Sequence, residues 1–184
     1  MSVLVIWSSP NQDGLTAAAK EAVLAGLKAA GTEAEAVQLN KLKLGHCCAC
    51  GSGRGWGSCR KEGTCWMDDD FQDLYEKMQA ADGVVFVTAV YWHDVTECMK
   101  AFLDRLRRCD AGHNHLLTGK KTLLAACAGG SGKGAVPCLD RLESVLADMG
   151  MQAADRMPVT RFNRSYLLPA LEAAGGAFAA ALSE

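Results

Sequence analysis

Three short apolar runs, each followed by a helical pattern, constrain the fold of this 184-residue chain more than any other feature. The runs cover residues 3–7, 83–88 and 122–127. Continuous apolar runs of this length are typical of strands that are buried on both faces of a sheet. Strands that alternate with helices pair in parallel through right-handed crossovers, so the pattern predicts a three-layer α/β sandwich.

Two weaker segments complete the expected sheet. Residues 33–39 alternate between apolar and polar side chains, as in a half-exposed edge strand, and residues 151–155 form a second weak candidate. Three apolar strands and two weaker ones fit a five-stranded parallel sheet in the flavodoxin-like order 2-1-3-4-5. Because 49% of the residues are hydrophobic, we expect residues 1–184 to form a single domain with its own core.

Helical patterns fill the intervals between the expected strands. Apolar residues recur with helical spacing from residue 16, from residue 71, from residue 99 and from residue 139, and an Ala-rich helix is expected over residues 166–182. The acidic triplet at 68–70 is expected to form the first turn of the second of these helices, because carboxylates are favourable near a helix N-terminus.

The charge and composition exclude several classes of function. A net charge of −2 without a basic run argues against nucleic-acid binding. No apolar run approaches the roughly 20 residues that span a bilayer, and no signal peptide precedes the first run, so we expect a cytoplasmic protein without a membrane partner. Nine cysteines in a reducing compartment favour metal or redox chemistry over a disulfide framework.

Three loops should meet at one edge of this sheet, because the carboxyl ends of neighbouring parallel strands lie together. They cover residues 8–16, 89–96 and 128–134. The first runs through small hydroxyl and Gly residues into a helix N-terminus, an arrangement that binds phosphate through backbone N–H groups and the helix dipole. The alternative is an ordinary strand-to-helix turn capped by Asp13 or Thr16.

Several separated motifs carry a resemblance to a known family. One is Ser9-Pro10 with Gly14-Leu15-Thr16, and another is Val90-Tyr91-Trp92 followed by the segment Met99-Lys100-Ala101-Phe102-Leu103-Asp104-Arg105. With these motifs, residues 3 to about 149 resemble the flavodoxin-like NAD(P)H-dependent FMN reductase family, including its iron–sulfur flavoprotein branch.

The resemblance implies FMN as cofactor, NAD(P)H as cosubstrate and a set of binding residues. The phosphate would be held by Ser9, Asn11, Leu15 and Thr16. Val90, Tyr91 and Trp92 would flank the isoalloxazine ring, and Gly129, Gly130 and Ser131 would approach it from the third loop. The chain departs from the family pattern at Asn11, Leu15, Ala89 and His93. The alternative for Tyr91 and Trp92 is a place in the core at a strand end, and His93 either projects over the flavin or lies on the surface.

A Cys- and Gly-rich loop over residues 45–66 shows neither helical nor strand periodicity. Cys47 and Cys50 form a C-x2-C pair, and Cys59 and Cys65 follow after eight and five intervening residues. Four such thiols can hold a [4Fe–4S] cluster or Zn²⁺, or they bind no metal and pack, line the active site or form reversible disulfides. The iron–sulfur branch has a compact cysteine motif at this place, with a shorter second gap. We expect Cys98, Cys109, Cys127 and Cys138 to be small buried hydrophobic residues.

These observations favour an FMN-dependent oxidoreductase that takes hydride from NAD(P)H and reduces a small acceptor such as a quinone, a flavin or a nitro compound. Such chemistry needs ring positioning and no catalytic side chain. One alternative is an iron–sulfur flavoprotein that carries electrons to a redox partner protein. Another is a redox-sensing or structural protein whose loop cysteines form a disulfide or hold zinc. The resemblance also implies a homodimer or homotetramer.

Overall fold

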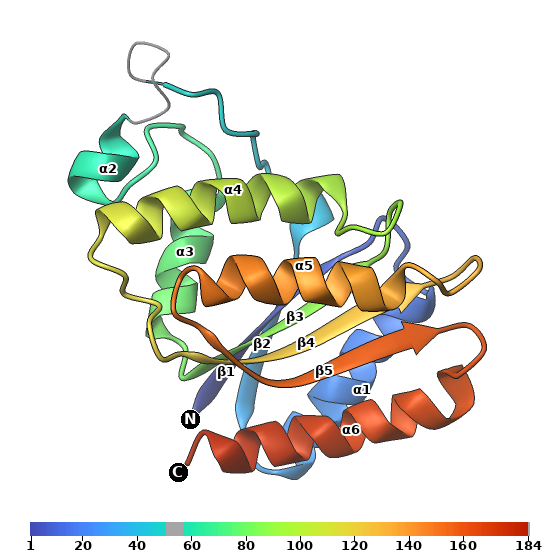
Figure 1. The fold of residues 1–184 in the computed structure, drawn as a ribbon. Coiled ribbons are helices and arrows are strands. Elements are labelled where there is room, and N and C mark those ends of the chain that lie inside the picture. Colours follow the sequence, from blue (N-terminus) through green and yellow to red (C-terminus); the bar gives the residue numbers. More distant parts are fainter. Residues whose placement is uncertain (51–56, 184) are drawn as a thin grey trace.

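A five-stranded sheet lies at the centre of the molecule (Figure 1). The computed structural model describes residues 1–50 and 57–183. All neighbouring strands pair in parallel, in the order β2-β1-β3-β4-β5, which confirms the predicted flavodoxin-like topology. The strands are β1 (Ser2–Ser8), β2 (Glu33–Gln38), β3 (Gly83–Ala89), β4 (Lys121–Ala128) and β5 (Gln152–Thr160).

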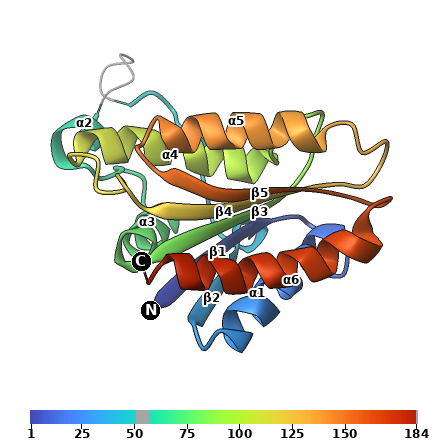
Figure 2. The same ribbon diagram turned by 60° about the horizontal axis from the view of Figure 1, so that its bottom comes forward.

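Helices cover both faces of the sheet (Figure 2). One face carries α1 (Leu15–Ala29) and α6 (Arg164–Ala181), and the other carries α3 (Phe71–Ala80), α4 (Glu97–Gly112) and α5 (Ala135–Ala147). Successive side chains of β1 point to opposite faces of the sheet, so they belong to two different core clusters. Val3, Val5 and Trp7 pack in the cluster with α1 and α6, whereas Leu4 and Ile6 pack in the cluster with the other three helices. The central strands are therefore apolar on both faces, as their sequence indicates.

Three segments differ from the sequence-based expectation. β5 is longer than the expected 151–155, and it tolerates Pro158 because an edge strand has one side without a ladder. The last helix begins at Arg164 and ends at Ala181. The loop 45–66 contains a short helix, α2 (Ser58–Glu62), while residues 51–56 of that loop lie outside the described residues. A single 3-10 turn, η1 (Leu39–Lys41), follows β2.

The acidic triplet does not form the first turn of α3, contrary to the expectation. That helix begins at Phe71, and the Asp70 side chain does not cap it. Instead, Asp70 accepts a hydrogen bond from the backbone N–H of Lys43 over 2.6 Å, and Asp69 accepts one from Gly45 N–H over 2.9 Å. The two carboxylates therefore attach this segment to the residues that follow η1, which a local helix-dipole argument could not predict.

The strand register places the three candidate loops at one edge. Ser8 pairs with Thr88, and Ala89 pairs with Cys127, so β1, β3 and β4 end at the same level. The loops 8–16, 89–96 and 128–134 leave the sheet there, as predicted. Over the described residues, no helix is both long and apolar enough to cross a membrane.

Candidate functional site

The N-terminus of α1 has no side-chain cap. Gly14 occupies the N-cap position in an extended conformation, and the structure shows no side-chain hydrogen bond there, so neither Asp13 nor Thr16 acts as the cap. The first backbone bond of the helix runs from Ala18 N–H to Gly14 C=O over 3.0 Å. The preceding N–H groups have no partner within the helix, and the positive end of the helix dipole lies at this point, a combination that favours phosphate binding.

The predicted phosphate-loop residues divide into two kinds. Ser9 is buried, and its hydroxyl accepts a 3.2 Å hydrogen bond from Asn11 N–H, so it shapes the turn. The Thr16 side chain is buried beside the Cys127 thiol at the end of β4, and the Leu15 side chain packs against the α1/α6 core cluster. Leu15 and Thr16 can therefore serve an anion through their backbone N–H groups, and their side chains fix the helix to the sheet.

The second loop contains a tight reversal between Tyr91 and Asp94. Tyr91 N–H donates to Asp94 C=O over 2.8 Å, and Asp94 N–H donates to Tyr91 C=O over 3.0 Å. Trp92 and His93 between them have φ of 49° and 68°, as in a type I′ turn, a conformation that costs about 1–3 kcal/mol per non-Gly residue. Trp92 is 96% exposed and Tyr91 is 39% exposed, so neither is a core aromatic residue.

The second and third loops enclose a groove of about 380 Å³. This volume lies within the range of small-molecule sites, roughly 300–1,000 Å³. A Cβ atom placed on Gly129 or Gly130 would meet no atom within 4 Å, so both residues border open space. The lining residues are Val90, Trp92, His93, Ala128, Gly129, Gly130, Ser131, Gly132 and Gly134.

The groove brings together five of the residues predicted to contact the ring, and Tyr91 is not among its lining residues. The residues of the first loop lie outside this lining as well, beside the end of β4, where Thr16 contacts Cys127. Sequence reasoning missed Ala128, Gly132 and Gly134 as lining residues. The Gly-rich composition of residues 128–134 was the available signal for them.

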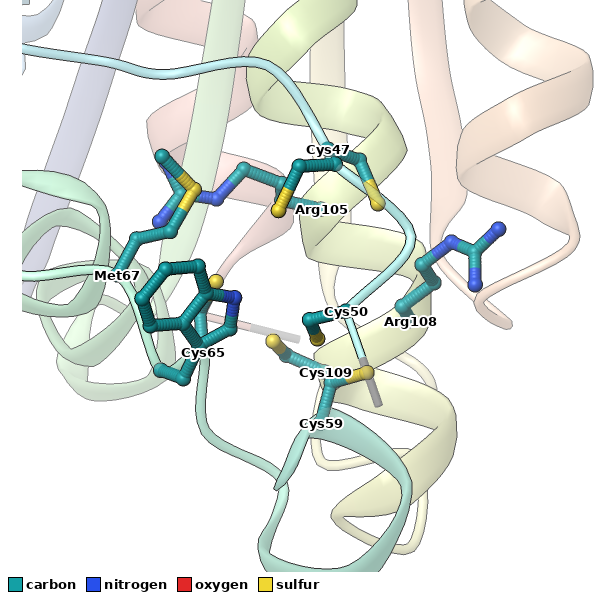
Figure 3. A pocket seen from close by; sticks show the side chains of 10 residues that line it. Cys47, Cys50, Cys59, Cys65, Met67, Arg105, Arg108 and Cys109 are labelled. Atoms are coloured by element: carbon teal, nitrogen blue, oxygen red, sulfur yellow. The ribbon is translucent and has the colours of Figure 1, made fainter. Parts of the chain in front are cut away.

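A second cavity lies among the thiols of the cysteine-rich loop and α4 (Figure 3). Its volume is about 20 Å³, enough for one water molecule and far too small for a flavin. All four predicted metal ligands line it, together with Cys48 and Cys109, which the sequence interpretation had not assigned to it. The full lining is Cys47, Cys48, Cys50, Cys59, Cys65, Trp66, Met67, Arg105, Arg108 and Cys109.

Arg105 connects this cavity to the acidic segment. Its guanidinium donates two hydrogen bonds to Asp69, of 2.6 and 2.7 Å, and one to Gly45 C=O over 3.0 Å, and it lines the cavity together with Cys65. It also lies 4.3 Å from the centroid of the Phe71 ring. Burial alone would raise the pKa of Asp69, but the hydrogen bonds from Arg105 and Gly45 N–H outweigh it and lower the pKa.

Two thiols of the cavity, those of Cys50 and Cys109, have a raised pKa. Burial raises the pKa of Cys50, and the neighbouring Cys59 thiol adds to the effect. Burial, with Cys65 and Cys59 nearby, raises the pKa of Cys109 to about 12. A metal that binds here must therefore displace protons from the thiols.

The side chains that line this cavity are of the chemical type that binds metal as thiolates. Those that the structure describes are not arranged around a common point. The cysteines of the cavity are soft sulfur donors, and two Arg side chains line the same space. Among the described residues, the buried Nε of Arg105 has no hydrogen-bond partner. However, over residues 1–50 and 57–183, no three Cys, His, Asp or Glu side chains lie in an arrangement ready to hold a metal ion.

The parallel sheet, the uncapped helix N-terminus and the groove at the end of the strands define a flavodoxin-like α/β protein. Solved structures share this fold at low sequence identity. An archaeal flavodoxin superposes with a TM-score of 0.67 at 14% identity, covering 100% of both chains. A flavone reductase superposes with a TM-score of 0.72 at 20% identity, covering 100% of this chain and 64% of that one.

Sequence comparison identifies the family. Residues 1–161 match the family model described as NADPH-dependent FMN reductase, and the chain belongs to this family. An iron–sulfur flavoprotein of Archaeoglobus fulgidus is 32% identical over 120 residues, which are 65% of this chain and 51% of that protein. One of Methanosarcina thermophila is 36% identical over 84 residues, which are 46% of this chain and 41% of that protein. The chain thus matches about half the length of these curated relatives or less.

Proposed function

We propose that this protein is an FMN-dependent oxidoreductase that takes hydride from NAD(P)H and reduces a small acceptor such as a quinone, a flavin or a nitro compound. The observation that carries the proposal is the groove of about 380 Å³ at the carboxyl ends of β3 and β4, on the sheet edge that the uncapped N-terminus of α1 shares. Membership of the FMN reductase family supports the same cofactor.

Each predicted residue has a role in this proposal that its surroundings support. Leu15 and Thr16 offer backbone N–H groups to the phosphate, while Ser9 and Asn11 hold the turn that presents them. Val90 and Trp92 line the groove for the ring, Tyr91 holds the turn that carries Trp92 through its backbone bonds to Asp94, and Gly129, Gly130 and Ser131 let the backbone approach the ring from the third loop. Bound FMN supplies the hydride and electron chemistry, so the protein contributes position and shielding from water.

The exposed aromatic residues near the groove support a homodimer or homotetramer. Trp92 is 96% exposed and Phe162 is 65% exposed, and Gly132 of the groove lies next to Phe162. Large exposed aromatic side chains are enriched in protein interfaces. We therefore propose that a second subunit covers this edge, and that the nicotinamide enters beside it. The free state of all nine cysteines agrees with a cytoplasmic location.

Absorption spectroscopy of the protein with added FMN tests the function. We expect a shift of the flavin bands on binding, and bleaching of those bands when NADH or NADPH is added without oxygen. Reoxidation by a quinone then identifies the acceptor class. A protein that neither binds FMN nor permits its reduction by a nicotinamide would contradict the proposal.

A second candidate function is an iron–sulfur flavoprotein that carries electrons to a redox partner protein, with a [4Fe–4S] cluster on Cys47, Cys50, Cys59 and Cys65. The convergence of these four thiols on one cavity favours it, and so does the printed name of the curated relatives. Iron and acid-labile sulfide in stoichiometric amounts, with slow NAD(P)H oxidation, would support this function over the first. Protein that contains FMN and takes up no iron would exclude it.

A further inference from the structure

We propose that Cys109 of α4 is a ligand of a thiolate metal centre, and that the loop cysteines close onto this helix-borne thiol. The inference deepens the metal-binding candidate function above and rests on it. It assigns one of the four ligand positions of such a centre to a thiol outside the loop motif, in place of one of the four loop cysteines, on an element whose position is fixed by the core. The shared chemistry is a soft metal bound by sulfur, either iron with sulfide or a zinc-like ion.

The face of α4 that borders the cavity carries both charge and sulfur. Arg105 and Cys109 are four residues apart, so they lie on the same face of the helix. Figure 3 shows the thiol of Cys109 directed toward the space that the thiols of Cys50 and Cys59 also approach. Cys109 is 1% exposed, and it belongs to the same core cluster as Phe102 and Leu106 of the same helix. Its position therefore does not depend on the loop.

Close backbone packing brings Cys59 to this part of α4. A Cβ atom on Gly112 would lie 1.6 Å from the carbonyl oxygen of Cys59, so only glycine permits the approach of α2. Gly112 is less than one turn beyond Cys109. In the same way, a Cβ atom on Gly57 would lie 2.4 Å from the sulfur of Cys50. Gly112 therefore leaves room for the backbone of Cys59, and Gly57 leaves room for the thiol of Cys50.

Arg105 supplies the charge that such a centre needs. Several thiolates around one metal ion carry a net negative charge, and burying that charge is costly without a compensating cation. The guanidinium is 2% exposed and lines the cavity together with the Cys65 thiol, and among the described residues its buried Nε–H has no acceptor. A metal-bound sulfur could accept the hydrogen bond that the Nε–H of Arg105 lacks among the described residues.

The kind of ligand atom that lines the cavity indicates which class of metal it would bind. Its potential ligands are six cysteines and the thioether of Met67, and no carboxylate or imidazole is among the lining residues that the structure describes. Sulfur ligands select Zn²⁺ and iron–sulfur clusters and disfavour Mg²⁺ and Ca²⁺, which bind through oxygen. Among the described residues the thiols do not surround a common centre, so metal binding requires the cysteine side chains to move together, which couples binding to local folding.

The test compares two single-thiol variants of the full chain. Cys109→Ser removes the proposed ligand, and Cys138→Ser is the matched control because Cys138 is also a buried cysteine on a helix but lies in α5, outside the cavity. One arm titrates reduced protein with Co²⁺ as a zinc analogue and follows the thiolate-to-metal absorption. The other arm reconstitutes the protein with iron and sulfide without oxygen and measures both elements per chain.

We expect Cys109→Ser to lose at least about tenfold in Co²⁺ affinity, or most of its iron and sulfide, while Cys138→Ser behaves like the wild type. The arm that responds identifies the metal class. Wild-type metal content in Cys109→Ser, or no uptake in either arm by the wild type, would overturn the proposal. FMN binding is followed separately by flavin fluorescence, so failure of the flavin function is distinguishable from failure of this one.

A second variant keeps every thiol and changes only how closely α2, with Cys59, packs against α4. Gly112→Ala must push α2 away from α4, because the new methyl group meets backbone. We expect the same direction of effect on metal uptake as in Cys109→Ser, with normal far-UV circular dichroism. If Cys109→Ser does not fold, the test depends on Gly112→Ala. Unchanged metal uptake in Gly112→Ala would then contradict the proposal.

Discussion

The buried guanidinium of Arg105 is hydrogen-bonded to two residues that are distant from it in the sequence, Gly45 and Asp69. The side chain is 1% exposed, and that of its partner Asp69 is 9% exposed. Removing one partner of such a pair leaves an uncompensated charge away from water, which costs more than the intact pair contributes. The pair is therefore a sensitive point of the structure even though it lies outside the sheet.

Asp69→Asn tests this pair. We expect the free energy of unfolding at pH 7 to fall by about 3 kcal/mol, because the amide leaves Arg105 without a counter-charge. Urea unfolding at equilibrium measures it. Asp68→Asn is the control, because Asp68 is exposed and should change stability by less than about 0.5 kcal/mol. An Asp69→Asn protein as stable as the control would show that the ion pair is unimportant.

The same pair predicts a pH dependence. The pKa of Asp69 is lower in the folded chain than in the unfolded chain, so its carboxylate stabilises the fold above the unfolded value of about 4. That contribution disappears as the pH falls through the folded pKa. The difference in unfolding free energy between wild type and Asp69→Asn should therefore be constant near neutral pH and shrink below about pH 4. A difference that grows on acidification would contradict the sign.

Trp92 tests the groove at the level of a single side chain. Because the indole is 96% exposed, Trp92→Ala should change the unfolding free energy by less than about 0.5 kcal/mol. If the proposed flavin site is correct, the dissociation constant for FMN should rise about tenfold through lost stacking. Trp66→Ala is the control, since Trp66 is also exposed but lines the thiol cavity. Equal FMN affinities in both variants would place the flavin elsewhere.

At the scale of elements, α4 begins in a buried hydroxyl network below the groove. Met99 N–H donates to Thr96 Oγ1 over 3.3 Å, which caps the helix, and Thr96 N–H reaches Thr88 Oγ1 at 3.5 Å. Thr88 in turn accepts a 3.0 Å hydrogen bond from the Ser8 hydroxyl. The network joins the ends of β1 and β3 to the start of α4, so it fixes the loop 89–96 between them.

Thr96→Ala removes this cap and should lower the unfolding free energy by about 1 kcal/mol. Thr96→Ser keeps the hydroxyl and should retain most of the stability. Thermal unfolding followed by circular dichroism distinguishes the two variants. Equal losses in both would mean that the methyl group of Thr96, and not its hydrogen bond, holds the helix start.

Local sequence patterns predicted the elements better than the contacts between them. The apolar runs at residues 3–7, 83–88 and 122–127 predict buried strands, because burial on both faces removes polar residues from consecutive positions. The thiol of Cys109 could not be assigned in this way, since a helical cysteine has the same local pattern whether it meets core or cavity. The attachment of Asp69 to Arg105 spans 36 positions and depends on how α4 packs, which no local period encodes.

At the scale of the whole molecule, the proposed cofactor should stabilise the fold by mass action. FMN at 100 times its dissociation constant should add about 2.7 kcal/mol to the unfolding free energy. For a chain of this length, we expect a rise in melting temperature of about 5 to 10 °C. Riboflavin is the control because it lacks the phosphate and cannot use the N-terminus of α1. An equal shift with riboflavin would show that the first loop does not bind phosphate.

The Arg105 connection has a further consequence for how the chain tolerates change. Gly45 and Asp69 are held together at the base of the cysteine-rich segment, so the two ends of that segment meet whatever its length. Closing a chain between fixed ends costs entropy that grows only with the logarithm of length, about 0.6 kcal/mol for each doubling. Insertions and deletions can therefore accumulate between the cysteines while the sheet is unaffected. The number of residues between its cysteines can thus change without affecting the flavodoxin-like sheet and its helices.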